Sequence, residues 1–260
     1  MKATTLIDVT RCTGCRGCQV SCKQWNQLPA ETTRFRGTYE NPPALSPITW
    51  TRVLFRERVH RGKVEWFFAK TQCMHCTDAS CITVCPTGAA HRTPEGTVKV
   101  DPNRCIGCNY CVANCPFEVP RYDPTRNAVR KCTFCYDRIT NGLKPACVQT
   151  CPTGALQFGD RQEMVRLAQR RVEELKAAGR TEARIYGLDE VAGTAVFYVL
   201  AEEPAVYGLV QDPQVPLTAT LWGIIFKPVR VLAVAGAVVA GLLARRQQAE
   251  DQGQERGGDL

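Results

Sequence analysis

The sequence lacks the residue patterns of an enzyme active site and of an exported protein's leader. It has three histidines, His60, His75 and His91, whose spacing fits no metal site, so we assign them to structure or solvent. It has no nucleophile and base pair, phosphate-binding loop or paired carboxylate motif. The N-terminal stretch MKATTLIDVTRC has no apolar signal-peptide core, so export would depend on a partner that carries one. These absences exclude a substrate site belonging to the chain itself.

Cysteine, in contrast, is abundant: the chain has 16, in four groups of four with none left over. The groups are Cys12, Cys15, Cys18, Cys22; Cys73, Cys76, Cys81, Cys85; Cys105, Cys108, Cys111, Cys115; and Cys132, Cys135, Cys147, Cys151. A disulfide scaffold is typical of small secreted chains, and 260 residues are enough to build a core without one.

The spacing within the groups favours iron–sulfur clusters over zinc. Structural zinc needs two Cys-x2-Cys knuckles separated by a longer loop, and of the four groups the fourth fits that pattern best. Groups one and three both read Cys-x2-Cys-x2-Cys-x3-Cys, which is typical of [4Fe–4S] ligands. The sequence therefore predicts four [4Fe–4S] clusters and no free cysteine.

The flanking residues indicate how the groups pair. Groups one and three follow the similar stretches IDVTR and VDPNR, whereas Cys85 and Cys151 each open the pentapeptide CPTGA. Residues 89–101 read as a hairpin that joins group two to group three. Groups two and three therefore form one two-cluster unit, 72–123. It is inserted between the halves of the other unit, 1–27 and 124–158.

In two-cluster ferredoxins the fourth cysteine of a run binds the neighbouring cluster. Applied to these two units, that rule predicts four mixed ligand sets. They are Cys12, Cys15, Cys18 and Cys151 for cluster 1; Cys22, Cys132, Cys135 and Cys147 for cluster 2; Cys73, Cys76, Cys81 and Cys115 for cluster 3; and Cys85, Cys105, Cys108 and Cys111 for cluster 4.

Three further segments surround the clusters. Cys22 precedes Lys23 where the other fourth cysteines precede proline, so we expect a helix to continue toward Pro29 and an insertion, 28–71, to follow. That insertion ends in alternating strands at 48–59 and 63–70. Its aromatic residues, Trp50, Phe55, Trp66, Phe67 and Phe68, are expected to pack over the cluster core.

Residues 159–215 form a predicted peripheral segment. Asp160 and Glu163 resemble a capping box for a helix to about Ala178, ended by Gly179. Residues 193–201, GTAVFYVLA, read as a buried strand.

The formal net charge of +8 would ordinarily suggest a nucleic acid or an anionic membrane as partner. An oxidised [4Fe–4S] core with four thiolates carries about −2, so four clusters bring the protein close to neutral. We therefore expect no nucleic-acid partner. The lysines and arginines are interpreted as balancing cluster charge, which also helps to set reduction potentials.

The stretch FKPVRVLAVAGAVVAGLLARRQQ predicts a membrane anchor within 216–246. From Pro228 to Ala244 it would form a helix of about 25 Å, the lower limit for a bilayer span, so a buried core helix is the alternative. Basic residues flank the run, and small residues at spacing four suit packing against another transmembrane helix. The charge balance leans toward a single-pass anchor in the cell membrane with a cytoplasmic C terminus and the clusters outside the cytoplasm. A charged tail, 247–260, follows.

The sequence resembles the iron–sulfur beta subunit of respiratory formate dehydrogenases over nearly its whole length. The resemblance is carried by RCTGCRGCQVSCKQWN, CMHCTDASCITVCPTGA, CIGCNYCVANCPFEVPRY and KCTFCYDRITNGLKPACVQTCPTGAL, and beyond the clusters by GTAVFYVLAEEPAVYGLVQDP and LWGIIFKP. It implies a catalytic alpha subunit with a molybdenum or tungsten pterin and a membrane cytochrome b gamma subunit that reduces quinone. It also implies that electrons enter at cluster 1 and leave through cluster 4 toward a haem.

The sequence thus predicts an α+β protein: two ferredoxin-like two-cluster units, one inserted in the other, plus a C-terminal transmembrane helix. Its predicted role is electron transfer, with formate oxidised in the partner subunit. One alternative is the equivalent subunit of a polysulfide or dimethyl sulfoxide reductase or of a hydrogenase complex. An alternative of another class is an iron–sulfur redox sensor, which should expose a labile cluster and would not need four in a row.

Overall fold

The structure is a computed structural model that describes residues 2–60, 62–226, 240 and 244. The chain divides into two compact units, Met1–Pro216 and Leu217–Leu260. The strands of the first unit are β1 (Ala3–Asp8), β2 (Arg52–His60), β3 (Lys63–Thr71), β4 (Ala90–Arg92), β5 (Val98–Val100), β6 (Arg121–Asp123), β7 (Ala128–Arg130), β8 (Leu156–Asp160), β9 (Arg184–Tyr186) and β10 (Val196–Leu200). Its α-helices are α1 (Gly17–Trp25), α2 (Ser80–Thr83), α3 (Tyr110–Ala113), α4 (Tyr136–Ile139), α5 (Ala146–Gln149) and α6 (Arg161–Ala177). Three 310 helices complete it, η1 (Val9–Arg11), η2 (Glu190–Ala192) and η3 (Pro204–Tyr207).

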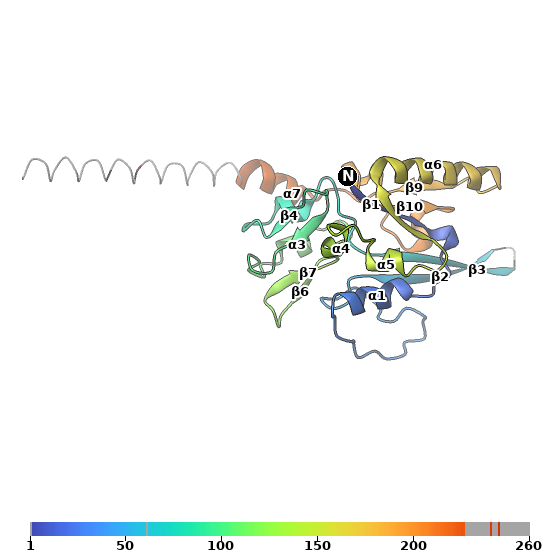
Figure 1. The fold of residues 1–260 in the computed structure, drawn as a ribbon, viewed down its shortest axis with the longest axis horizontal. Coiled ribbons are helices and arrows are strands. Elements are labelled where there is room, and N and C mark those ends of the chain that lie inside the picture. The colour runs from blue at the N-terminus through green and yellow to red at the C-terminus, as the bar shows by residue number, and fades with distance from the viewer. Residues whose placement is uncertain (1, 61, 227–239, 241–243, 245–260) are drawn as a thin grey trace, which may run out of the picture. The chain divides into compact units, whose positions relative to one another are not determined.

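A four-stranded mixed sheet in the order β8-β1-β10-β9 organises the first unit. β1 and β10 run parallel, with Ile7 opposite Tyr198, while β8 and β9 pair antiparallel at the edges. The segment 159–215, predicted to be peripheral, therefore supplies β10, a central strand. Helix α6 lies along one face of this sheet (Figure 1).

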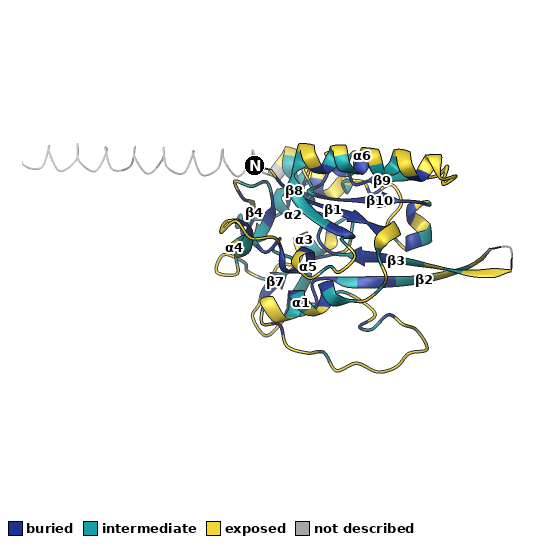
Figure 2. Cartoon of the chain, turned by 45° about the vertical axis from the view of Figure 1, so that its right-hand side comes forward, coloured by how far each residue is buried: buried dark blue, intermediate teal, exposed yellow. Residues whose placement is uncertain are grey.

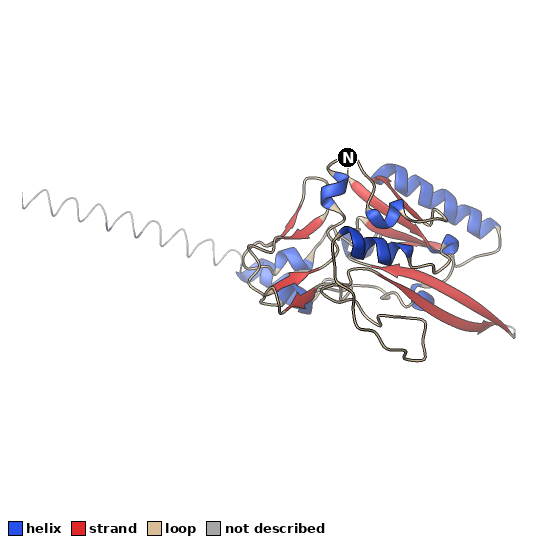
Figure 3. Cartoon of the chain, turned by 60° about the horizontal axis from the view of Figure 1, so that its bottom comes forward, coloured by secondary structure: helices blue, strands red, loops and turns tan. Residues whose placement is uncertain are grey.

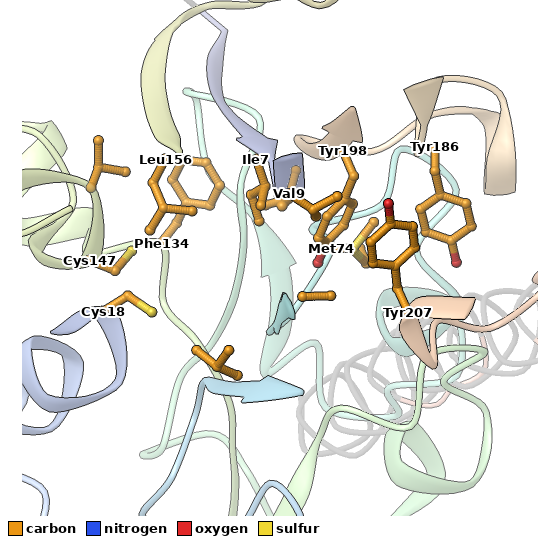
Figure 4. Packing of buried hydrophobic residues seen from close by; sticks show 14 of the residues in the cluster. Ile7, Val9, Cys18, Met74, Phe134, Cys147, Leu156, Tyr186, Tyr198 and Tyr207 are labelled. Carbon is orange, nitrogen blue, oxygen red and sulfur yellow. The ribbon is translucent and has the colours of Figure 1, made fainter. Parts of the chain in front are cut away.

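Strand β10 is buried on both faces, so all five of its residues are apolar or aromatic, as the sequence predicted for a buried strand. Successive side chains alternate between the faces. Phe197 and Val199 pack against α6, and Tyr198 belongs to the opposite cluster, which includes Phe134 and Cys147 (Figure 4). Figure 2 shows β10 as buried, whereas the outer side of α6 is exposed. The sheet thus separates a helix layer from a layer that contains cysteines.

Three two-stranded hairpins, β2–β3, β4–β5 and β6–β7, account for the remaining strands (Figure 3). The predicted hairpin at 89–101 is confirmed as β4 and β5. The predicted strands at 48–59 and 63–70 are confirmed as β2 and β3, except that β2 begins at Arg52 and not at residue 48. Of the five aromatic residues expected to pack over the cluster core, Trp50 is buried, and Phe55, Phe67 and Phe68 pack against the main core, whereas Trp66 is 42% exposed. The hairpin β6–β7 spans the predicted boundary at 123/124. The subdivision of the first unit remains a prediction.

Helix α6 is confirmed close to its predicted limits. Asp160 caps it by accepting a hydrogen bond from the Gln162 N–H at 3.0 Å. The helix ends at Ala177, two residues before Gly179, whose φ is +86°. The predicted continuation of α1 to Pro29 was too long, because the helix ends at Trp25 and Gln27 has a φ of +50°. A left-handed residue cannot continue a right-handed helix.

Helix α1 also explains why no proline follows Cys22. Cys22 lies inside α1, and its carbonyl oxygen accepts the Asn26 N–H at 3.2 Å. Cys85, Cys115 and Cys151 instead lie two residues beyond the ends of the short helices α2, α3 and α5. A proline at position 23 would remove a helical hydrogen bond and clash with the preceding turn, whereas proline after a helix end is compatible with the chain leaving it.

The second unit contains α7 (Leu217–Leu221) and a π-helical turn, η4 (Trp222–Phe226). Within the residues that the structure describes, none of the helices has the length and hydropathy needed to cross a bilayer. Almost all of the predicted span from Pro228 to Ala244 lies outside the described residues.

Candidate metal centres

Local structure fixes the loop that carries the first cysteines. Asp8, which is almost completely buried, caps η1 by accepting the Thr10 N–H at 3.0 Å. Its carboxylate also pairs with the Arg171 guanidinium of α6, with a distance of 3.0 Å from Oδ2 to Nε. This cap sets the direction of the chain just before Cys12.

A close aromatic contact holds the same loop from the other side. Gly14 has a φ of +67°, and a Cβ there would lie 3.0 Å from Phe68 Cδ1 and 3.1 Å from Phe55 Cε1. Glycine is therefore required both by the backbone conformation and by the space available. The β2–β3 hairpin thus packs directly on the loop between Cys12 and Cys15.

The sixteen cysteines are all free thiols, so none is committed to a disulfide. In the first predicted set, the Cys12 thiol interacts electrostatically with Cys15 and Cys151, and the Cys18 thiol with Cys12 and Cys15. Cys151 comes from the far end of the cluster region, and it reaches this set because α5 packs against α1.

The second and third predicted sets each line a cavity. One cavity is bordered by Cys22, Cys132, Cys135 and Cys147, together with Trp50 and Phe134. The other is bordered by Cys73, Cys76, Cys81 and Cys115, together with His75, Ser80 and Lys131. In both cavities, three cysteines from one run meet the fourth cysteine of a different run.

The fourth predicted set gathers around α3. The Cys111 thiol interacts electrostatically with Cys105, Cys85 and Cys108. Cys108 is exposed, as is Cys15 of the first set, whereas the other fourteen cysteines are buried or half-buried. The exposed thiols therefore belong to the first and fourth sets.

Thiols of successive sets also interact across their boundaries. Cys18 of the first set interacts with Cys147 of the second, Cys132 of the second with Cys73 of the third, and Cys81 of the third with Cys111 of the fourth. These three interactions favour a linear order of the four sets: one, two, three, four.

Burial raises the pKa of most of these thiols. Desolvation is the main cause, with repulsion between neighbouring thiolates added, and the pKa rises to about 12 for Cys18, Cys81, Cys111 and Cys132. Burial alone would also raise the pKa of Cys85, but hydrogen bonds from the Ala90 N–H and the Thr87 hydroxyl outweigh it and lower that pKa. Bound metal deprotonates coordinating thiols, so cluster binding offsets the electrostatic cost of burying them as thiolates.

Backbone donors and unpaired polar atoms fit negatively charged clusters. The N–H groups of Ala90 and Val129 point at the sulfurs of Cys85 and Cys105, both at 3.3 Å. His75 Nδ1 accepts the Val98 N–H at 3.0 Å, which leaves the ring proton on Nε2. Nε2 and the Ser80 hydroxyl are buried without a partner among the described residues, and both residues line the third cavity. Cluster sulfides accept hydrogen bonds from such donors.

Among residues 2–60 and 62–226, no three histidine, cysteine or carboxylate side chains converge as they would around one metal ion. A cubane binds each thiolate through a separate iron atom, which requires a wider separation of the sulfurs.

Two lysines lie at these sites that the sequence did not single out, because its lysines and arginines were interpreted together as balancing cluster charge. Lys70 lies near the end of β3 and Lys131 directly before Cys132, and both are buried. The position of Lys131 next to a ligand cysteine was a signal in the sequence, whereas nothing local distinguishes Lys70 from the other basic residues of the hairpin.

Two family models, both described as 4Fe-4S dicluster domains, match the chain, one over residues 11–89 and one over residues 64–161. Together they cover all four cysteine groups. They support four [4Fe–4S] clusters as the cofactors of this chain.

Curated relatives match over most of the chain. The nitrate-inducible formate dehydrogenase iron–sulfur subunit of Escherichia coli (strain K12) is 46% identical over 244 residues, covering 92% of this chain and 82% of the relative. The formate dehydrogenase iron–sulfur subunit of Haemophilus influenzae is 44% identical over 90% of this chain and 77% of its own length. Formate dehydrogenase 2 subunit beta (cytochrome c-553) of Nitratidesulfovibrio vulgaris is 40% identical over 80% of this chain and 97% of its own length. This chain therefore belongs to the family of formate dehydrogenase iron–sulfur subunits, which transfer electrons within an oxidoreductase complex and are not its catalytic subunits.

Proposed function

We propose that this chain conducts electrons from a molybdenum- or tungsten-pterin catalytic subunit, where formate is oxidised, to a membrane cytochrome b subunit that reduces quinone. The crossed ligand sets would hold the four clusters, each of which supplies one-electron transfer when bound. Electrons would enter at the first set, with Cys15, and leave at the fourth, with Cys108.

The observation that carries this proposal is the series of electrostatic interactions between thiols of successive sets, from which we infer their linear order. The order rests on the links Cys18 to Cys147, Cys132 to Cys73 and Cys81 to Cys111. A relay needs a continuous series of closely spaced centres, whereas a sensor needs one accessible centre.

The distribution of exposed thiols supports the same proposal. The two exposed cysteines are Cys15 and Cys108, at opposite ends of the proposed order, and the second and third sets line cavities. In the middle of the series, protein packing excludes water and limits access to oxidants. At the ends, the exposed ligands leave room for a partner subunit to approach.

The test is formate-driven reduction of the complex, purified gently under anaerobic conditions. We expect a pterin subunit to copurify and formate to reduce all four centres, detected by low-temperature EPR. In a Cys15→Ala complex, formate should no longer reduce the second to fourth centres at the normal rate, although dithionite still does.

The matched control is Cys108→Ala, which changes the exposed ligand at the other end. Formate should still reduce the first three centres of that complex. Loss of their reduction in Cys108→Ala, with normal reduction in Cys15→Ala, would reverse the proposed direction. Equal reduction of the remaining centres in both variants would refute a linear relay.

We also propose that residues 217–246 anchor the chain in the cell membrane, with the clusters outside the cytoplasm and the C terminus inside. The support is the apolar run between basic residues in the sequence. Cutting before Leu217 should leave the clusters intact and release the chain from membranes that lack the partner subunits. A truncated chain that stays fully bound would contradict this anchor. Labelling of engineered surface cysteines with a membrane-impermeant reagent in whole cells tests the orientation.

A further inference from the structure

Lys70 and Lys131 are buried in the middle of the cluster region, with exposed fractions of 1% and 4%. Lysine is almost never buried so fully unless its charge is paired. The Tyr198 hydroxyl of β10 donates to the Lys70 carbonyl oxygen at 2.9 Å, so the central sheet fixes the backbone of this residue. These two lysines are therefore ordered parts of the core.

Neither lysine has a carboxylate partner among the residues that the structure describes. The Lys70 ammonium donates to the side-chain oxygen of Gln72, and the Lys131 ammonium donates to the carbonyl oxygens of Val98 and Cys132, the latter at 3.2 Å. All of these acceptors are neutral. Burying an ammonium group without a counter-charge is strongly unfavourable, so negative charge must be supplied by other groups nearby.

Lys70 lies beside the second thiol set, because its ammonium donates to Gln72 and Gln72 lines the cavity of that set. Its charge acts on Cys18 of the first set and on Cys22, Cys132 and Cys147 of the second. It also acts on Cys12 and Cys135, one from each set. Lys70 is therefore positioned where both of these clusters would contribute negative charge.

Lys131 directly precedes Cys132 of the second set and lines the cavity of the third. Its charge acts on Cys73 and Cys81, both in the third set, and on Cys132 of the second. Cys115, the crossed ligand of the third set, is affected as well. Lys70 and Lys131 are the only lysines or arginines buried to this extent in the described part of the chain.

We propose that Lys70 and Lys131 are shared counter-ions, Lys70 for the first and second clusters and Lys131 for the second and third, and that they raise the reduction potentials of those clusters. Reduction adds one electron to a cluster while the lysine keeps its proton and no bond changes. A fixed positive charge stabilises the more negative, reduced form more strongly, especially where water is excluded. The second cluster, which is next to both lysines, should receive the largest effect. This inference rests on the ligand sets proposed above.

The experiment is a dithionite titration of the purified holoprotein, followed by EPR, with Lys70→Met and Lys131→Met variants. The EPR signals are first assigned with one ligand variant for each cluster. Lys70→Met should lower the equilibrium constant for reduction of the first and second clusters at least tenfold, which corresponds to a decrease in reduction potential of about 59 mV for a one-electron couple. Lys131→Met should do the same to the second and third. The fourth cluster should not change in either variant.

Lys144→Met is the matched control, because Lys144 is exposed and water screens its charge. It should leave all four potentials unchanged. Where a Met variant binds less iron than the wild type, the titration is done with the Gln variant, which is neutral but still forms hydrogen bonds. The charge-retaining Lys70→Arg and Lys131→Arg variants should stay close to the wild-type potentials.

Unchanged potentials in both neutral variants would overturn the proposal, as would an equal shift of all four clusters. The titration uses neither formate nor a partner subunit, so its result is separate from the proposed direction of electron flow. An incorrect ligand set would be visible beforehand, in the signals of the ligand variants.

Discussion

Replacing Cys22 with alanine should damage the second cluster and spare the first, although Cys22 lies on the same helix as Cys18. The Cys22 side chain lines the cavity bordered by Cys132, Cys135 and Cys147. Among the thiols, Cys132 and Cys147 have the strongest electrostatic interactions with Cys22. One turn of α1 separates Cys18 from Cys22, so the helix presents them to neighbouring sites.

The size of the effect follows from the ligand count. Four clusters contain about 16 iron atoms per chain, and each thiolate supplies one of the four protein bonds to its cluster. Loss of one ligand should leave a three-iron centre, with about 15 iron atoms per chain, or no centre, with about 12. Iron and labile sulfide analysis separates these two results.

The assay is low-temperature EPR during a redox titration, with Cys15→Ala and Cys135→Ala as references for the first and second clusters. We expect the spectrum of Cys22→Ala to resemble that of Cys135→Ala. The reciprocal change, Cys151→Ala, should resemble Cys15→Ala, because the Cys151 thiol interacts with Cys12. If Cys22→Ala instead resembles Cys15→Ala, each run binds its own cluster and the crossed architecture is wrong.

Three further predictions follow. Gly14→Ala should change the EPR signal of the first cluster, because the added Cβ would lie 3.0 Å from Phe68. The control Gly37→Ala has a similar φ of +72° but nothing within 4 Å, so it should leave that signal unchanged, and an equal change in both variants would contradict the contact argument. Asp8→Ala should lower the free energy of unfolding by about 2 kcal/mol, because it removes a helix cap and leaves Arg171 without its buried partner. Thermal unfolding followed by circular dichroism measures this free energy, and a change below about 0.5 kcal/mol would refute the prediction. Anaerobically purified protein should contain about 16 iron atoms and about 16 labile sulfides per chain with little zinc, and oxidative removal of the iron should unfold the cluster region. About four zinc atoms per chain and no labile sulfide would contradict the iron–sulfur assignment.

The sequence predicted the local elements well where a short stretch carries its own signal. The spacing of the cysteines, the hairpin at 89–101 and the cap at Asp160 depend on residues close together in the chain. The end of α1 was predicted less well, because Gln27 adopts a left-handed conformation that a glutamine in the sequence gives no reason to expect. The ligand sets themselves remain predictions, to which the lining of the two cavities adds support.

By itself, the sequence determined the number and type of cofactors and the likeness to formate dehydrogenase subunits, because cysteine spacing and local motifs carry both. The pairing of the cysteine groups remains a prediction. Only the tertiary structure decided that β1 pairs with β10 across almost the whole chain, since long-range pairing depends on which surfaces remain to be buried. It alone also buried Lys70 and Lys131 and put them beside the cavities that the second and third thiol sets line. A buried lysine and an exposed lysine look the same in a sequence. Only folding brings Lys70 and Lys131 close to the cysteines that determine their electrostatic surroundings.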